Sequence, residues 1–106
     1  MAEEAVVVTA VFTPRPNGRE ALVAALAPAI AEVHEEPGCE LYAIHDAPDG
    51  TVVMIEKWTS AAALDAHASG AAVQRLDTAI AELIAQPVVV TRLSPIPAGT
   101  PQQGMI

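Results

Sequence analysis

The chain alternates between short runs of β-branched residues and longer segments in which apolar residues recur every three or four positions. The short runs predict four strands, at residues 5–12, 39–46, 51–58 and 88–93. The helical spacing predicts one helix between Asn17 and Pro37, a short helix after Ser60, and a third helix ending at Pro87. The predicted order is therefore strand, helix, strand, strand, two helices, strand.

Turn and capping residues set the predicted boundaries of these elements. Asn17 followed by Glu20 resembles a capping pair that opens the first helix, and Pro37-Gly38 ends it. The DAPDG segment at 46–50 predicts a tight turn between the second and third strands. Residues 1–97 are expected to form a single domain, and 98–106 a Pro- and Gly-rich tail that is extended or disordered.

This order of elements predicts an α+β fold of the ferredoxin-like, split βαβ type, with helices on one face of an antiparallel sheet. The strands carry apolar residues on both faces, so the uncovered face would form a large apolar patch in a monomer. We place Cys39, Leu41, Ala43 and His45 together on one face of the second strand. We expect a homodimer in which two sheets face each other.

Composition and charge exclude several classes of partner. The 106 residues carry a formal net charge of −8, which repels nucleic acid and anionic membranes. No apolar run is long enough for a membrane span, and the acidic N-terminus lacks the basic region of a signal peptide. Cys39 is the single cysteine, so no disulfide can form within the chain, and we expect a cytoplasmic location.

The candidate site lies at the end of the third strand and on the short helix. Glu56 and Trp58 share one strand face, and His67 shares an inward helix stripe with Leu64. Imidazole titrates at about pH 6.5, which makes His67 a candidate general base. Trp58 and Tyr42 could form an aromatic wall for a flat substrate. Each of these residues could equally serve packing at the edge of the core.

The remaining polar residues have structural interpretations. Glu56 could orient His67 or form an ion pair with Arg75 or Arg92. The other histidines, His34 and His45, lie on separate elements without metal-ligand spacing, so we expect no metal site. A reactive Cys39 would need a nearby base, and the sequence indicates none.

Three segments together are similar to a known family: EEPGCELYAIHD, VVMIEKWTSAAALDAH and VVVTRLSPIP. They resemble the antibiotic biosynthesis monooxygenase domain, including the small quinol monooxygenases. The resemblance implies a dimeric α+β barrel that oxidises a quinol or a polycyclic, polyketide-like phenol with O2, without metal or flavin. The A-H pair of the resemblance supports His67 as the base, and from their strand positions we expect Tyr42, Trp58 and Glu56 to contact the substrate.

Two departures from the family pattern leave other functions open. Many quinol monooxygenase-like members carry a second histidine shortly after the A-H pair, where this chain has Ser69-Gly70-Ala71. The haem-degrading branch uses an Asn on the first strand, which residues 5–12 lack, so we do not expect haem degradation. The alternatives are a dimeric module that binds a small ligand without turnover, and a non-oxidative polyketide cyclase or isomerase.

Overall fold

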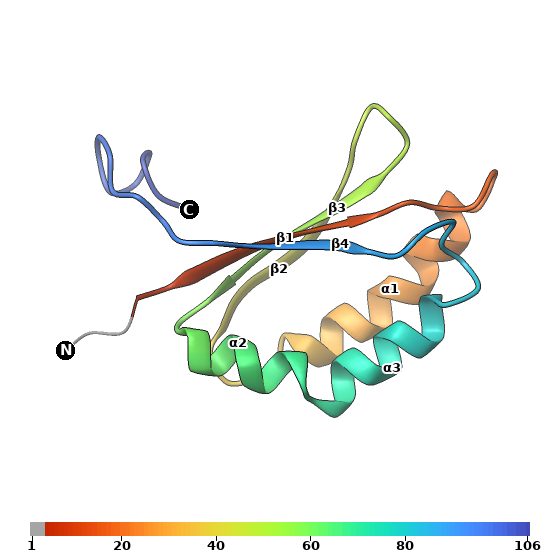
Figure 1. Ribbon diagram of the computed structural model, residues 1–106, viewed down its shortest axis with the longest axis horizontal. Helices are drawn as coiled ribbons and strands as arrows, with labels where there is room; N and C mark the ends of the chain where they lie inside the picture. Colours follow the sequence, from red (N-terminus) through yellow and green to blue (C-terminus); the bar gives the residue numbers. More distant parts are fainter. Residues whose placement is uncertain (1–3) are drawn as a thin grey trace.

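One antiparallel sheet and three helices form the part of the chain that the structure describes, residues 4–106 (Figure 1). In this computed structural model the elements are β1 (Val6–Phe12), α1 (Arg19–Val33), β2 (Cys39–Asp46), β3 (Val52–Trp58), α2 (Ala61–Ala68), α3 (Ala71–Ile80) and β4 (Val89–Leu93). The strand order is β2-β3-β1-β4. The predicted ferredoxin-like α+β fold is confirmed. The first three residues of the predicted domain lie outside the described part.

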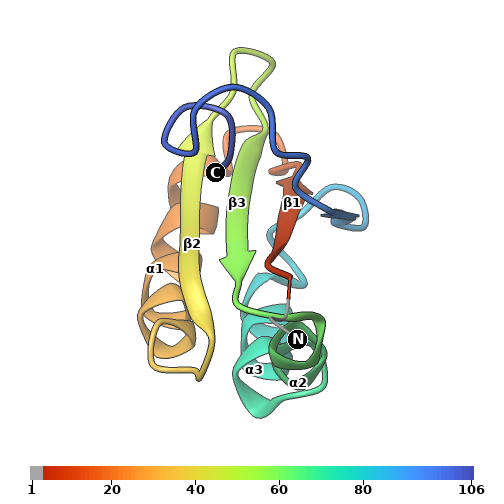
Figure 2. The same cartoon turned by 90° about the vertical axis from the view of Figure 1, so that its left-hand side faces the viewer.

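All three helices lie on one side of the sheet and enclose the core (Figures 1 and 2). From α1 the fully buried side chains are Leu22, Leu26 and Val33, which lie four and then seven residues apart, the spacing of one helix face. They pack with Met54 and Trp58 of β3, both of which are fully buried. Each large side chain buried in this way stabilises the fold by about 1.5–3 kcal/mol.

The opposite face of the sheet carries no helix among residues 4–106 (Figure 1). By strand alternation it presents Val7, Val11, Leu41, Val53, Ile55, Val89 and Leu93, which we call the outer face. Cys39 does not belong to it, contrary to the sequence prediction. A bulge between Cys39 and Leu41 shifts the register, so Cys39 pairs with Trp58 and packs against the core.

Two predicted helix boundaries are wrong. The N-cap of α1 is Gly18, without a side-chain hydrogen bond, because Asn17 adopts a left-handed conformation with φ of 61°. Helix α3 ends at Ile80 rather than near Pro87, because the following segment runs beside the residues just after β1. There Ile84 forms a bridge with Pro14, and Ala85 N–H donates to the Thr13 carbonyl at 2.8 Å.

The C-terminal tail lies on the side of the sheet away from the helices (Figure 1). The sequence predicts it to be extended or disordered, yet it contains a turn at 100–103. Gly104 N–H donates to the Thr100 carbonyl at 2.7 Å, and the Thr100 hydroxyl bonds the Gln103 side chain at 2.9 Å. Among residues 4–106, no helix has both the length and the apolar character that a membrane crossing requires.

Candidate functional site

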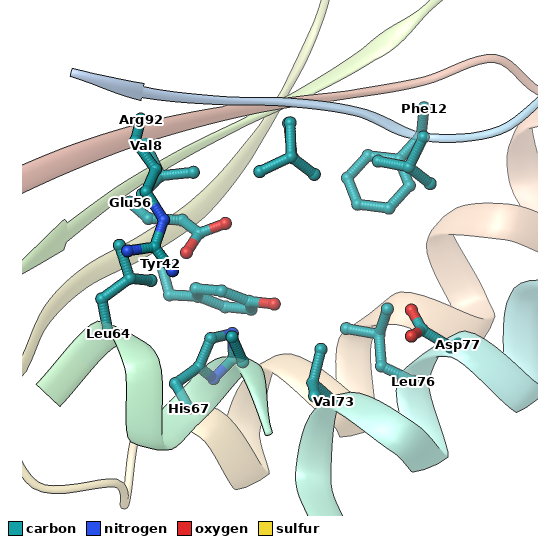
Figure 3. Close-up of a pocket in the computed structure, with 14 residues that line it drawn as sticks. Val8, Phe12, Tyr42, Glu56, Leu64, His67, Val73, Leu76, Asp77 and Arg92 are labelled. Atoms are coloured by element: carbon teal, nitrogen blue, oxygen red, sulfur yellow. The ribbon is translucent and has the colours of Figure 1, made fainter. Parts of the chain in front are cut away.

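A cavity of about 180 Å³ lies between the sheet and the two short helices, α2 and α3. Figure 3 shows that its two ends differ in chemistry. One end gathers the polar side chains Tyr42, Glu56, His67 and Arg92. The other end is mainly apolar, with Phe12, Val73 and Leu76, and with Asp77 at its edge. A ligand that fits this cavity has a polar group at one end and an apolar body.

Strand register builds the polar end. Glu56 of β3 pairs with Tyr42 of β2 and with Val8 of β1, and Val8 in turn pairs with Arg92 of β4. These four residues therefore form one row across the sheet, and all of them line the cavity. The row spans every strand, so its spacing is fixed by the backbone hydrogen bonds of the whole sheet.

His67 faces this row from α2. Ser60 caps the helix as predicted, with its Oγ accepting from Ala63 N–H at 3.1 Å. The helix begins close to the Pro37-Gly38 turn. Gly38 has φ of 85°, and a Cβ atom at this position would lie only 2.6 Å from the Cβ of Ala63. The absence of a side chain at Gly38 thus lets α2 and its histidine approach the start of β2.

The orientation of His67 is fixed by a carboxylate and two aromatic rings. Nδ1 lies 3.0 Å from Oε1 of Glu36, and because a carboxylate only accepts, Nδ1 carries the proton. The imidazole is tilted by 30° over Trp58 with ring centroids 4.5 Å apart, and it meets Tyr42 edge to face at 5.4 Å. His67 is 5% exposed and lines the cavity. In the neutral imidazole this arrangement leaves Nε2 as the acceptor.

The sequence does not identify Glu36 as a site residue. The suggested partners of Glu56 are also wrong: Glu36, not Glu56, orients His67. Arg75 instead pairs with Glu32, and Arg92 pairs with Asp65 at 2.8 Å. The available signal for Glu36 was the Pro37-Gly38 turn directly after it, which redirects the chain toward α2.

Glu56 is a carboxyl group buried within the polar end, 5% exposed. Its Oε1 accepts a hydrogen bond from Trp58 Nε1–H at 3.0 Å. Burial raises the pKa of Glu56, while that hydrogen bond and the nearby His67 and Arg92 oppose the rise. Glu56 is therefore a stronger base than an exposed carboxylate.

The two predicted aromatic residues occupy different positions. Tyr42 lines the cavity, and Figure 3 shows its hydroxyl directed into the space toward Val73 and Leu76. Burial, assisted by the charge of Glu56, raises the pKa of Tyr42 above its usual range, so the hydroxyl remains a donor. Trp58 is fully buried behind the cavity, where it supports the His67 ring and holds Glu56.

The other histidines and the cysteine lie away from this cavity. His34 Nε2 bonds the Tyr42 carbonyl at 3.0 Å, and exposed His45 contacts the Val53 carbonyl through Nδ1 at 3.2 Å. Burial raises the pKa of the Cys39 thiol, which disfavours a reactive thiolate. Within residues 4–106, no cluster of three or more His, Cys, Asp or Glu side chains could hold a metal ion.

Comparison with known proteins places the chain in a family. The model of the antibiotic biosynthesis monooxygenase family matches residues 5–78, which include Glu36, Tyr42, Glu56 and His67. The chain belongs to the antibiotic biosynthesis monooxygenase family. The predicted resemblance is thus confirmed at the level of the family.

Relatives of known structure agree with this assignment. "Putative monooxygenase Rv0793" of Mycobacterium tuberculosis is 37% identical over 92 residues, covering 86% of this chain and 91% of that protein. Its solved structure superimposes with a TM-score of 0.81 at 35% identity, covering 91% of this chain and 99% of that one. Protein SO0527 from Shewanella oneidensis has 30% identity and a TM-score of 0.76, with coverages of 86% and 90%. Family and named relative support monooxygenase activity.

Proposed function

We propose that this protein is a monooxygenase that oxidises a small quinol or phenol with O2 at the polar end of the cavity, without metal or flavin. The observation that carries the proposal is the buried His67, with Nδ1 held by Glu36 and with the ring lining an otherwise mainly apolar space. A general base in such a setting suits a substrate that must be deprotonated before it reacts with oxygen.

The proposed reaction begins with proton transfer to His67. Nε2 takes the proton of the substrate hydroxyl, and the Glu36 carboxylate stabilises the imidazolium that forms. The resulting phenolate donates electrons to O2, and a carbon–oxygen bond forms at the ring. For a quinol the balance is one quinol plus one O2, giving one hydroxyquinone and one water. The apolar walls keep bulk water away from the reactive intermediate.

The cavity indicates the size and orientation of the substrate. A volume of about 180 Å³ is below the 300–1,000 Å³ typical of sites for drug-sized ligands, which favours a compound of one or two rings. The rings would occupy the end near Phe12 and Leu76, with the hydroxyl toward His67. Tyr42 would donate a hydrogen bond to a substrate oxygen, and Glu56 would contact the substrate. Trp58 would act through His67 and Glu56 rather than as a direct wall.

The proposal includes a homodimer formed through the outer face. Val89 and Leu93 on that face are 54% and 42% exposed in the single chain. Leu41, Val53 and Ile55 continue the same apolar surface across β2 and β3. Burying such a face between two copies follows from the hydrophobic effect. Size-exclusion chromatography with light scattering at micromolar concentration should give the mass of two chains. A mass of 10.9 kDa would contradict the proposed homodimer.

Oxygen uptake tests the activity directly. Purified protein, treated with chelator, is mixed with a panel of reduced naphthoquinols while oxygen and hydroxyquinone are followed. Enzyme-dependent uptake should fall at least ~100-fold in His67→Ala, the usual scale for losing a general base. His45→Ala makes the same change at an exposed histidine outside the cavity and should match the wild type. Uptake no faster than autoxidation throughout the panel would contradict the proposal.

A module that binds ligands without turnover is the second candidate. The turn between α2 and α3 reads Ser69-Gly70-Ala71, where many quinol monooxygenase-like proteins have a second histidine. The cavity would still hold a small aromatic ligand in that case. Thermal stabilisation of the protein by a naphthoquinone, without oxygen consumption from any quinol, would favour this candidate.

A further inference from the structure

Glu56 is a carboxyl group in a place where stability alone would favour an apolar residue. It lies on the face of β3 that buries Val52, Met54 and Trp58, and it is 5% exposed. Taking a carboxylate out of water is costly, and a buried acid in a cavity is a recognised mark of a functional group. Its position in the row between Val8 and Tyr42 holds it over the ligand space.

One oxygen of this carboxyl group is committed and the other is available. Oε1 is held by Trp58 Nε1–H, and within residues 4–106 no hydrogen bond occupies Oε2. In the described part, every fully buried side-chain oxygen or nitrogen has a hydrogen-bond partner. Since Oε2 has none, it is not fully buried. Figure 3 shows the carboxyl group of Glu56 directed into the cavity, at the same end as His67. Oε2 can therefore meet a bound ligand.

The proposed oxygenation needs proton removal at two atoms of the substrate. The hydroxyl loses its proton before oxygen adds, and the ring carbon that gains oxygen must later lose its hydrogen. These atoms lie at different positions of the ring, whereas Glu36 and Trp58 hold the imidazole of His67 in one orientation. A second base near the first, aimed at the ring carbon, would serve the later proton removal.

We propose that Glu56 is that second base and removes the hydrogen from the oxygenated ring carbon. This inference rests on the proposed function. His67 first takes the hydroxyl proton and returns it to the peroxide, giving a hydroperoxide on the ring. Oε2 of Glu56 then takes the carbon-bound proton; its electron pair forms the new carbonyl, the O–O bond breaks, and hydroxide leaves. The hydroxide takes the proton from Glu56, which forms water and restores the carboxylate.

The surroundings of Glu56 suit this role. Burial raises the pKa of Glu56 and makes its ionised form a better proton acceptor, while Arg92 and His67 favour ionisation. Tyr42 stays protonated at the same end and offers a hydrogen bond rather than a base. Asp77 lines the opposite end of the cavity, away from His67 (Figure 3).

The test compares Glu56→Gln with the wild type on naphthoquinol and on the same quinol deuterated at its ring carbons. Glutamine keeps an oxygen for Trp58 but cannot accept the proton. We expect turnover to fall at least ~100-fold. We also expect a deuterium isotope effect that the wild type lacks, and oxygen consumed in excess of hydroxyquinone formed. Glu40→Gln is the matched control, because Glu40 pairs with Lys57 outside the cavity, and it should behave as wild type.

The outcomes separate this inference from the proposed function. Wild-type turnover in Glu56→Gln, without an isotope effect, would overturn the role of Glu56 and leave the oxygenase intact. No enzyme-dependent uptake in the wild type would overturn both. If Glu56→Gln does not fold, Glu56→Asp carries the test, since it keeps a carboxylate but withdraws it from the substrate. Slower turnover with an isotope effect is then expected, and unchanged turnover would refute the inference.

Discussion

The two faces of the sheet differ in what covers them and in where their polar residues lie. The inner face is covered by helices, yet it includes Glu56 and Arg92 among its apolar residues. The outer face has no helix over it among residues 4–106, yet it is made mainly of Val, Leu and Ile. A polar residue on a covered face is costly and indicates a site, whereas apolar residues on an open face indicate a partner. Four substitutions test this comparison.

Trp58→Ala should give the largest effect, because it removes a large, fully buried ring from the inner face. The ring is fully buried, and removing a buried Trp costs about 3–5 kcal/mol of the free energy of unfolding. Urea denaturation at fixed protein concentration measures the loss. Gln74→Ala, at an exposed position of α3, is the control and should change stability little. Equal losses in both variants would show that the inner face is not the stabilising one.

Ile55→Asp should break the proposed dimer. It puts a charge at the middle of the outer face, and burying an unpaired charge costs several kcal/mol, so dimerisation should weaken at least ~100-fold. Light scattering across a concentration series measures the change in mass. Asp49→Ala, in the β2–β3 turn, is the control and should remain associated like the wild type. A dimeric Ile55→Asp would mean that the outer face is not the interface.

Ser60→Ala should have a moderate effect on stability and a further effect on the site. Loss of the N-cap of α2 costs about 0.5–2 kcal/mol. Since α2 carries His67, we also expect lower oxygenase turnover, measured at a temperature where the variant is folded. Ser69→Ala, at the other end of the same helix, is the comparison and should retain more activity.

Glu56→Gln should have a small effect on stability that depends on pH. The pKa of Glu56 is raised in the folded protein, so between its unfolded and folded values the native state binds more protons than the unfolded state. The wild type therefore loses stability as pH rises through this window, which begins near the ordinary value of 4.5. Chemical denaturation at a series of pH values should show that the free energy of unfolding of Glu56→Gln rises relative to that of the wild type as pH rises. If the difference in free energy of unfolding between the two proteins does not vary with pH, the prediction is wrong.

The sequence predicts the fold better than the site, for physical reasons. Alternation along each strand and the apolar stripe of α1 are local patterns, and they define both faces of the sheet and the ferredoxin-like order. The contact between Glu36 and His67 joins residues 31 positions apart, and it depends on how the Pro37-Gly38 turn aims a side chain. The misplacement of Cys39 has a similar origin, because one bulged residue reverses which face a side chain occupies.

Some residues that line the cavity lie inside the segment that the family model matches, and others lie beyond it. The family model ends at residue 78, so Glu36, Glu56 and His67 lie inside the shared segment. Val90 and Arg92, which border the same cavity on the edge strand β4, lie beyond it, and Val90 is 61% exposed. Substitutions on β4 can therefore change the border of the cavity along one strand while Glu36, Glu56 and His67, the proposed acid–base groups, stay untouched. A library confined to alternate positions of β4 would vary the ligand space beside the proposed acid–base groups without changing those groups.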